Sequence, residues 1–270
     1  MEHVSKYTAK IPDANGMVDF TAEENSVWQD LITRQIPIVE RLACDEFIEG
    51  LKILDLPMDR IPQCPELNEK LGQATGWAVE PVPALIPVEQ FFELLANKKF
   101  PAATFIRRRE ELDYLQEPDI FHEYFGHCPL LTNQAYADFA QAYGEVALNA
   151  DKEDRQALGR LYWFTVEFGL MNTPKGLKNY GGGILSSKDE TIYAVESDTP
   201  IRKPLGRGLD ALRTPYRVDI IQPVYYVIDD FAQLYDLITN DVFGTIRKAR
   251  ELGEFAPNFE PMGPNFELKC

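Results

Sequence analysis

The sequence has 270 residues, 45% of them hydrophobic and 26% charged, as in a globular protein with one large core or two small ones. Its formal net charge of −16 argues against nucleic acid or an anionic membrane as a partner, because both need a positively charged surface. No uncharged apolar run reaches about eighteen residues, and the first ten residues lack an apolar core, so neither a transmembrane helix nor a secretory signal is predicted.

The first predicted element is a helix that begins after Thr21. Glu24 stands three residues after this threonine, as in a capping box, and apolar residues then recur at helical spacing through Ile32. Pro37 is expected to end or kink this helix, because proline lacks the backbone N–H. A helical pattern then resumes over residues 38–54.

The middle of the chain mixes extended and helical patterns. Residues 75–87 are interrupted by prolines and are expected to be extended. Residues 88–99 form a short amphipathic helix, and residues 100–107 read as a strand. Further helices are expected over residues 133–149 and 153–171.

The last third begins with the glycine run Tyr180–Gly183, which interrupts the helical pattern. Residues 218–229 read as a short strand pair or an extended stretch. A final helix is expected over residues 230–250, with Gly244 as a candidate break. These elements predict a single, mostly α-helical domain with a few short β-strands, of the α+β class, over residues 1–270.

The cysteines are scattered along the chain and form no CxxC pair. Reduced thiols in a cytoplasmic protein are therefore expected, and a cysteine-based metal site is not. The four residues are Cys44, Cys64, Cys128 and Cys270.

Two of the three histidines, His122 and His127, stand five residues apart in the segment PDIFHEYFGHCPLL. On a straight α-helix, residues five apart point about 140° away from each other, so they cannot easily share an ion. Gly126 is a natural helix stop, and Pro129 disfavours helical geometry at Cys128. We therefore expect a helix that ends after His122 and a turn at Gly126 that returns His127 to the same point. By itself this stretch supports a metal site and two unrelated histidines about equally.

A carboxylate in the predicted helix 153–171 favours the metal site. Glu167 lies in RLYWFTVEFGLMN, and burying it unpaired on an apolar helix face would cost several kcal/mol. It therefore needs a cation, either a metal held by the two histidines or an arginine. The residues three and four positions away on either side are all apolar: Trp163, Phe164, Leu170 and Met171.

Two histidines and one carboxylate are the ligands of non-haem iron(II) oxygenases and of some catalytic zinc sites. A helical zinc peptidase would place its second histidine at Gly126, which disfavours that class without excluding it. The aromatic residues around Glu167 favour a flat, apolar substrate. A zinc hydrolase and a metal-stabilised binding module without turnover are the alternatives.

Three ordered segments, EPDIFHEYFGHCPLL, LYWFTVEFGL and YGGGILSS, resemble the pterin-dependent aromatic amino acid hydroxylases. The resemblance covers about residues 77–231 and is nearest to the short bacterial phenylalanine 4-hydroxylases, also called phenylalanine 4-monooxygenases. It implies a single catalytic domain of this type, without a regulatory domain or a tetramerisation helix, and therefore a monomer or dimer.

The resemblance also implies a reaction. L-Phenylalanine would be hydroxylated to L-tyrosine with iron(II), dioxygen and a tetrahydropterin, either tetrahydrobiopterin or a bacterial analogue, through a ferryl-oxo intermediate. A tryptophan-hydroxylating member of the same family is the nearest alternative.

The resemblance implies the roles of individual residues. The iron ligands would be His122, His127 and Glu167. The tetrahydropterin would lie against residues 84–88, in particular Ala84, Leu85, Ile86 and Val88. Phe91 would stack on the pterin ring, and Glu123 would reach it, often through water.

The substrate side is implied in the same way. Arg107 would pair with the carboxylate of the amino acid, whereas Arg108 and Arg109 would be surface charges. Gly183 would allow the backbone to approach the substrate, and Ser186 would hydrogen-bond the ligand His122. Leu115 stands where several animal members have a threonine, so one polar contact would be missing. The aromatic lining would come from Tyr162, Trp163 and Phe168.

Overall fold

The computed structural model describes residues 7–83, 86–113, 115 and 117–260. Helices predominate among them, and the strands are short. The α-helices are α1 (Ala22–Leu42), α2 (Asp45–Leu54), α3 (Cys64–Ala74), α4 (Val88–Ala96), α5 (Gln134–Leu148), α6 (Lys152–Tyr162), α7 (Gly182–Leu185), α8 (Lys188–Glu196), α9 (Leu209–Arg213), α10 (Phe231–Thr239) and α11 (Val242–Leu252). The predicted mostly helical α+β class is confirmed.

Shorter helical segments of other types separate these helices. They are the 3₁₀ turns η1 (Arg109–Glu111) and η3 (Leu130–Thr132), and the π-helices η2 (His122–His127) and η4 (Trp163–Glu167). π-Helices are rare and occur frequently at functional sites, which directs attention to η2 and η4.

The strands form two small sheets. In the first, β1 (Ala78–Val82) and β2 (Lys99–Ala103) pair in parallel, with α4 as the connection between them. The second sheet has the order β4-β3-β6-β5. In it β3 (Gly169–Thr173) and β4 (Gly176–Asn179) form an antiparallel hairpin, and β6 (Val224–Ile228) pairs in parallel with both β3 and β5 (Ile201–Pro204).

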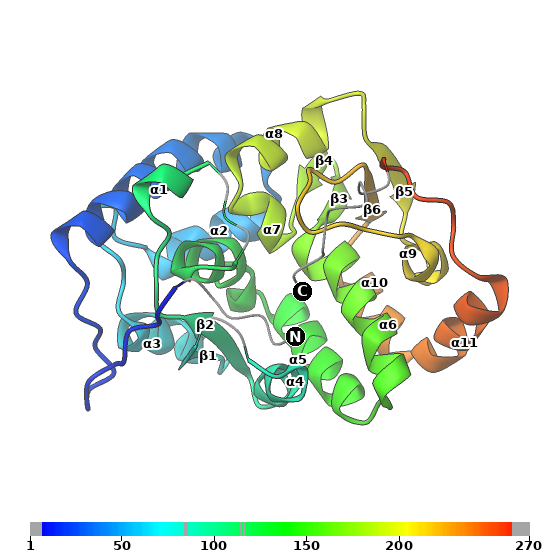
Figure 1. Ribbon diagram of the computed structural model, residues 1–270, viewed down its shortest axis with the longest axis horizontal. Helices are drawn as coiled ribbons and strands as arrows, with labels where there is room; N and C mark the ends of the chain where they lie inside the picture. The colour runs from blue at the N-terminus through cyan, green and yellow to red at the C-terminus, as the bar shows by residue number, and fades with distance from the viewer. Residues whose placement is uncertain (1–6, 84–85, 114, 116, 261–270) are drawn as a thin grey trace.

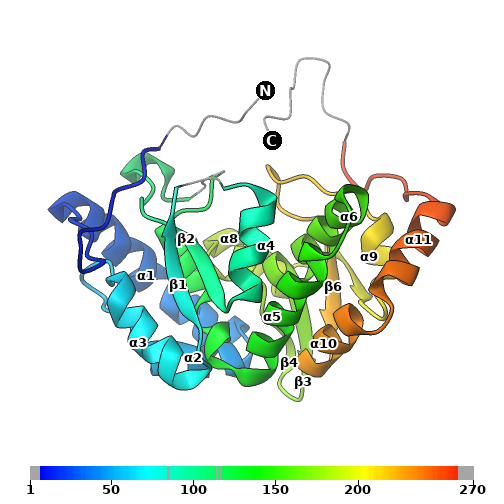
Figure 2. The same ribbon diagram turned by 90° about the horizontal axis from the view of Figure 1, so that it is seen from below.

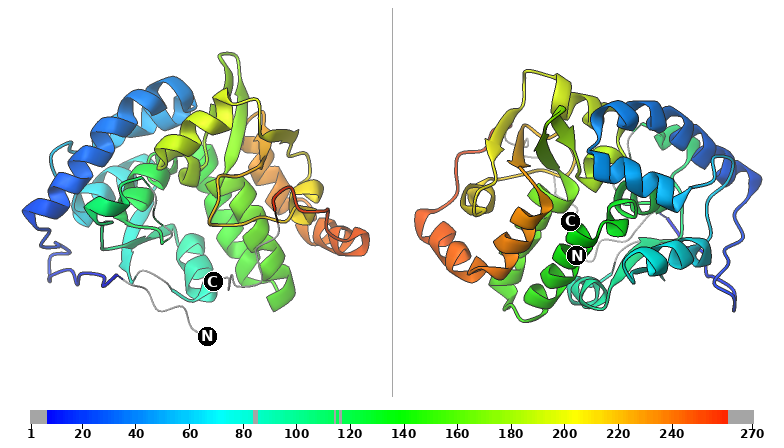
Figure 3. Two further views of the ribbon diagram at one scale, coloured as in Figure 1. Left: turned by 45° about the horizontal axis from the view of Figure 1, so that its top comes forward. Right: turned by 180° about the vertical axis from the view of Figure 1, so that it is seen from behind.

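The N-terminal and C-terminal helices lie at opposite ends of the molecule, α1 to α3 at one end and α11 at the other (Figures 1, 2 and 3). Helix α5 lies between them and packs against α4 and α10. The histidine-bearing segment η2 packs against α7 and β2, and η4 packs against α7, β3 and β6. Helix α7 therefore touches both π-helices.

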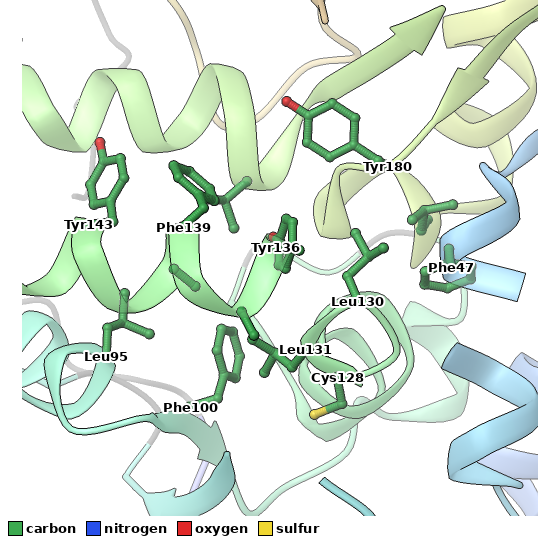
Figure 4. Packing of buried hydrophobic residues seen from close by; sticks show 14 of the residues in the cluster. Phe47, Leu95, Phe100, Cys128, Leu130, Leu131, Tyr136, Phe139, Tyr143 and Tyr180 are labelled. Carbon is green, nitrogen blue, oxygen red and sulfur yellow. The ribbon is translucent and has the colours of Figure 1, made fainter. Parts of the chain in front are cut away.

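The main core is apolar and rich in aromatic rings. Tyr136, Phe139 and Tyr143 are spaced along α5 and are fully or almost fully buried (Figure 4). Phe100 of β2 and Leu95 of α4 pack beside them, and Tyr180 and Phe47 lie farther along the same cluster (Figure 4). This burial fixes the scaffold from which η2 projects.

Pro37 does not end the first helix, so that half of the prediction of an end or a kink was wrong. Helix α1 continues through Pro37 to Leu42, so residues 38–42 belong to it rather than to a second helix. The break falls at Cys44, whose backbone N–H donates to Asn179 O at 2.9 Å. This contact attaches the chain to the end of β4 and favours extended backbone there. The predicted capping box of Thr21 and Glu24 is present.

Other element boundaries also differ from expectation. The strand predicted over residues 100–107 ends at Ala103, and residues 218–223 precede β6 as a loop. The last predicted helix is broken between Thr239 and Val242, near the break expected around Gly244, because Asp241 adopts a left-handed conformation and caps α11 with its side chain. In the part of the chain that the structure describes, no helix is long and apolar enough to cross a membrane.

Candidate active site

His122 and His127 stand at the two ends of η2. A π-helix is defined by hydrogen bonds between residues five apart, and the bond from Cys128 N–H to Glu123 O, at 3.2 Å, has this spacing. Residues five apart therefore lie on one side of the helix, and the Nε2 atoms of the two histidines are 3.0 Å apart. The π-helix explains why these histidines are separated by five residues rather than four.

The predicted helix stop at Gly126 was wrong, because this residue lies inside η2. Cys128 also has helical backbone angles, φ −58° and ψ −34°, despite the proline that follows it. Gly126 is needed for space, since a Cβ atom there would lie 2.7 Å from Gly182 O. A Cβ atom on Gly182 would in turn lie 2.3 Å from Cε1 of His127. The two glycines thus let α7 approach the histidine segment.

Glu167 is the last residue of η4, and its carboxylate faces the histidines. Its Oε2 atom lies 3.3 Å from Nε2 of His127 and 3.6 Å from Nε2 of His122. Two atoms that each bind one ion at about 2.1 Å are about 3.0 Å apart at a right angle and about 3.4 Å apart at a tetrahedral angle. The three observed separations therefore fit ligands of a shared metal ion.

The surroundings of Glu167 differ from the predicted apolar helix face. The helix ends at this residue, and Leu170 and Met171 lie on strand β3 instead. The N–H groups of Tyr180 and Gly181 both donate to Gly169 O, at 3.1 and 3.0 Å, which holds the chain in the sheet from this point. The structure brings together the three residues that the sequence predicted as ligands, but the helix geometry used to argue for Glu167 was wrong.

Ser186 fixes the tautomer of His122. The Ser186 hydroxyl donates its only hydrogen to Gly182 O, at 2.9 Å, so it accepts a bond from Nδ1 of His122, also at 2.9 Å. Nδ1 therefore carries the proton, and the lone pair of Nε2 is directed at the other two ligands. His127 is held by packing against Phe100, with ring centroids 4.9 Å apart.

The charges at this centre follow from burial and neighbouring groups. Burial lowers the pKa of His122 to about 4, against the opposing effect of the Glu167 carboxylate. Burial alone would raise the pKa of Glu167, yet the two histidines hold that pKa below its ordinary value. Burial, followed by the charges of Glu167 and Asp119, raises the pKa of Glu123 well above its ordinary value. At neutral pH His122 is therefore neutral and Glu167 ionised, whereas the environment of Glu123 favours its protonated form.

Glu123 is a second carboxyl group near the histidines. One of its oxygens and one nitrogen of each ring lie within 4.8 Å of one another. A metal ion requires its carboxylate ligand in the ionised form. The pKa of Glu167 is lowered and that of Glu123 is raised, so Glu167 gives up its proton more readily and is the better third ligand.

A cavity of about 690 Å³ opens beside this centre, within the roughly 300–1,000 Å³ typical of ligand pockets. Two of the three metal-ligand candidates, His122 and Glu167, line it, as does Leu115. It is also lined by every residue that the resemblance places on the substrate side: Arg107, Tyr162, Trp163, Phe168, Gly183 and Ser186.

Aromatic rings form one wall of the cavity. The Trp163 ring lies between Phe168, at a centroid distance of 4.4 Å, and Tyr216, at 4.9 Å. A Cβ atom on Gly183 would come within 3.0 Å of the Phe168 ring, so this glycine makes room for the aromatic wall. A flat apolar group fits beside such a wall.

Arg107 is buried and already has a charged partner. Its Nε and Nη2 atoms donate to the two oxygens of Asp119 at 2.8 and 2.9 Å, and its backbone N–H donates to Oδ2 at 2.9 Å. Asp119 is fully buried and also accepts from the backbone N–H of His122, at 3.1 Å. A guanidinium has five N–H donors, so donors beyond these two can face a carboxylate in the cavity. The exposed Arg109 pairs with Asp30.

None of the described residues proposed by resemblance for the pterin is among those that line the cavity. Ala84 and Leu85 fall outside the described residues. Phe91 contacts the ring of Tyr162 edge-on at 5.3 Å, and Tyr162 lines the cavity. Val88 is 47% exposed at the start of α4. Ile86 is partly exposed just before it.

Sequence reasoning missed two features of this site. Asp119 joins Arg107 to His122, and an acid three residues before a helical histidine was an available capping signal. The loop 218–221 also lines the cavity, although the sequence predicted strand or extended structure there. Its apolar residues Val218 and Ile221 are 38% and 47% exposed, a pattern that favours a binding surface over a core strand.

Two imidazoles and a carboxylate that converge beside an aromatic-walled cavity define a protein of the two-histidine, one-carboxylate class, in which the ligands occupy one face of a metal ion. The family model for the biopterin-dependent aromatic amino acid hydroxylases matches residues 3–252. The chain belongs to this family.

Individual relatives are similar over nearly the whole chain. Phenylalanine-4-hydroxylase of Pseudomonas aeruginosa is 52% identical over 257 residues, which cover 95% of this chain and 97% of the relative. The phenylalanine hydroxylase structure from Legionella pneumophila matches with a TM-score of 0.91 and 54% identity, covering 93% of this chain and 100% of that one. The Chromobacterium violaceum enzyme, solved with iron(III) and 7,8-dihydrobiopterin, matches with a TM-score of 0.83 and 43% identity, covering 94% and 93%.

Proposed function

We propose that this protein is a phenylalanine 4-monooxygenase, which converts L-phenylalanine to L-tyrosine with iron(II), a tetrahydropterin and dioxygen. The observation that carries the proposal is the convergence of His122, His127 and Glu167 at one side of a cavity with an aromatic wall. The similarity to phenylalanine hydroxylases over nearly the full chain supports phenylalanine, rather than tryptophan, as the substrate.

In this proposal His122, His127 and Glu167 hold the iron. When bound, iron(II) and the tetrahydropterin supply the electrons that activate dioxygen. Two of these residues, His122 and Glu167, line the cavity, so a metal held by the three would be accessible from it. Ser186 keeps Nε2 of His122 free of a proton, and the negative charge of Glu167 balances part of the metal charge.

The cavity orients the amino acid. Arg107 donates N–H groups to the substrate carboxylate, while Asp119 holds the guanidinium at a fixed angle from the opposite side. Trp163, Phe168 and Tyr162 contact the aromatic ring, and their apolar surface excludes water from the reacting carbon. Fixing both ends of the substrate places the ring carbon next to the metal.

The tetrahydropterin binds on the other side of Tyr162, against Phe91. The Phe91 ring offers a face for stacking, and Ile86 and Val88 extend the apolar surface at the start of α4. The resemblance adds Ala84 and Leu85 to the proposed pterin contacts. Glu123 reaches the pterin, directly or through water, and its raised pKa favours the form that donates a hydrogen bond.

The proposal extends to the setting of the enzyme. Residues 1–270 act as a single catalytic domain that works as a monomer or dimer. A cytoplasmic location is supported by the free, buried thiols of Cys44, Cys64 and Cys128, because a reducing compartment keeps such thiols unpaired. Light scattering of the purified protein tests the assembly.

One experiment tests the reaction. Anaerobic protein is loaded with iron(II) and tetrahydropterin, dioxygen is admitted, and phenylalanine, tyrosine and tryptophan are offered separately. We expect tyrosine from phenylalanine at the highest rate, and no product without dioxygen. A hydroxylated product from tryptophan alone would support the tryptophan-specific alternative, and hydrolytic activity with zinc in the absence of dioxygen would support a zinc hydrolase.

A further inference from the structure

Gln222 is hydrogen-bonded to two residues that line the cavity, Trp163 and Glu190. It is 1% exposed and immediately follows the cavity-lining loop 218–221. Its Oε1 atom accepts from the indole N–H of Trp163 at 3.2 Å, and its backbone N–H donates to Oε1 of Glu190 at 2.9 Å. Trp163 belongs to η4, which carries Glu167, and Glu190 belongs to α8. A single residue thus joins the loop to two helices of the site.

The side-chain amide also closes the loop on itself. Both of its hydrogens are used, because Nε2 donates to Arg217 O and to Ile220 O, each at 2.8 Å. One of these carbonyls directly precedes the stretch 218–221 that lines the cavity, and the other lies within it. The amide therefore sets the curvature of the loop and the direction of the Trp163 ring at the same time.

We infer that Gln222 is a positioning residue for the aromatic ring of the substrate. It fixes the loop 218–221 and the Trp163 indole relative to each other, and so sets the width of the slot that receives the ring. The inference deepens the proposed function and rests on it for its substrate. Gln222 does not line the cavity, so it acts through these two elements rather than by contact with the substrate.

The hydrogen bonds of Gln222 explain how the cavity would keep its preference for the phenylalanine ring over the larger indole of tryptophan. The rings of Phe168 and Tyr216 pack against the Trp163 indole and restrict its tilt. The hydrogen bond from the indole N–H to Gln222 then fixes how the indole is rotated within its own plane. The loop carries the exposed apolar side chains Val218 and Ile221. Without the hydrogen bonds from the Gln222 amide, the loop would no longer hold these side chains in one position. A buried polar group with every donor and acceptor satisfied specifies one arrangement.

The first test measures the loop directly in metal-free protein. Gln222→Met keeps the length of the side chain and removes its donors and acceptor. The bond between Arg217 and Val218 is a trypsin site, and its carbonyl is the one that Gln222 holds. We expect cleavage there to be about ten-fold faster than in the unmodified protein, because the loop opens more often. Cleavage after Lys175, in the turn between β3 and β4, is the internal reference and should not change.

The second test measures kinetics on the iron-loaded enzyme. Gln222→Met should raise the phenylalanine KM about five-fold or more, lower the preference for phenylalanine over tryptophan, and leave the tetrahydropterin KM within about two-fold. Gln73→Met, on the exposed surface of α3, is the matched control. In a Trp163→Phe background, Gln222→Met should change selectivity less, since the indole bond is already absent.

Gln222→Glu supplies a second variant of the same size. It retains an acceptor for the Trp163 N–H but cannot donate to the two loop carbonyls when ionised, so faster cleavage after Arg217 is expected here too. Unchanged cleavage and an unchanged ratio of phenylalanine to tryptophan turnover in both folded variants would overturn the inference. Loss of folding in both would also overturn it, in favour of a purely structural role. If the unmodified enzyme makes no tyrosine, the proposed function fails, whereas the cleavage result still decides whether Gln222 holds the loop.

Discussion

Arg107→Lys tests how the substrate carboxylate is held. Arg107 makes two side-chain hydrogen bonds to Asp119, and the side chains of both residues are almost fully buried, at 7% and 0% exposure. Lysine keeps the charge but has a single donor nitrogen, so it loses the planar pair of donors that grips Asp119 while others face the cavity. A hydrogen bond to a charged group is worth about 1.5–3 kcal/mol, and burial leaves little solvent screening to reduce it.

Two effects follow from this loss. The free energy of unfolding should fall by about 1.5–3 kcal/mol, and the Tm by about 3–12 °C for a chain of this size. The phenylalanine KM should rise about ten-fold or more, because each 1.4 kcal/mol is a factor of ten in binding. More tetrahydropterin should also be oxidised per tyrosine formed, since a loosely held ring lets the oxidant decay unproductively.

The assay combines thermal unfolding with steady-state kinetics at saturating tetrahydropterin. Arg109→Lys is the matched control, because Arg109 and its partner Asp30 are 44% and 47% exposed and such a surface pair is worth only about 0–1 kcal/mol. If Arg107→Lys matched Arg109→Lys in Tm, phenylalanine KM and coupling, Arg107 would not be the carboxylate partner.

The remaining predictions concern pterin binding, metal binding and the stability of the metal-free protein at acid pH. Phe91→Ala should raise the tetrahydropterin KM about three- to ten-fold, with little change in the phenylalanine KM, and an unchanged pterin KM would place the cofactor elsewhere. Ser186→Ala should weaken iron binding about 10- to 100-fold in an equilibrium titration, and full affinity would show that the bond to His122 is dispensable. Metal-free protein should lose stability as pH falls from about 6.5 to about 4, because over this range the unfolded state protonates His122 and the folded state does not. The loss is about 3 kcal/mol, and a His122→Gln variant that lost as much over the same range would contradict this origin.

The sequence was sufficient for features with local causes. The capping box at Thr21 and the helix α5 were predicted because their signals lie within a few residues of each other. The residues His122, His127 and Glu167 were also found, since chemically reactive side chains stand out by type against an apolar background. Each of these features can be recognised from its own residue type or from its near neighbours in the sequence.

The geometry that unites these ligands was not predictable in the same way. A π-helix differs from an α-helix by one residue in hydrogen-bond spacing. The segment η2 has only six residues, which are too few to reveal a changed spacing of apolar residues in the sequence. The end of η4 depends on contacts between Gly169 and the later segment around Gly181. Helix α1 likewise ends where Cys44 meets Asn179, far along the chain, and not at Pro37.

Residues that act through a distant partner were missed for a related reason. Asp119 became significant only when the fold placed it between Arg107 and His122. Gln222 stands 59 positions from Trp163 in the sequence, and nothing near it indicates that bond. Loop 218–221 was interpreted as part of a short strand pair or an extended stretch, because its apolar residues suit a sheet as well as a binding surface.

The most direct test of the metal centre is the iron content and tyrosine yield of Glu167→Gln. The amide is nearly isosteric, so the fold should persist while the negative charge that balances the metal is lost. We predict that the folded variant binds little iron(II) and forms almost no tyrosine, whereas Glu153→Gln, on the exposed face of α6, behaves as the unmodified protein does. Normal iron content with full hydroxylation in Glu167→Gln would contradict the assignment of the three ligands.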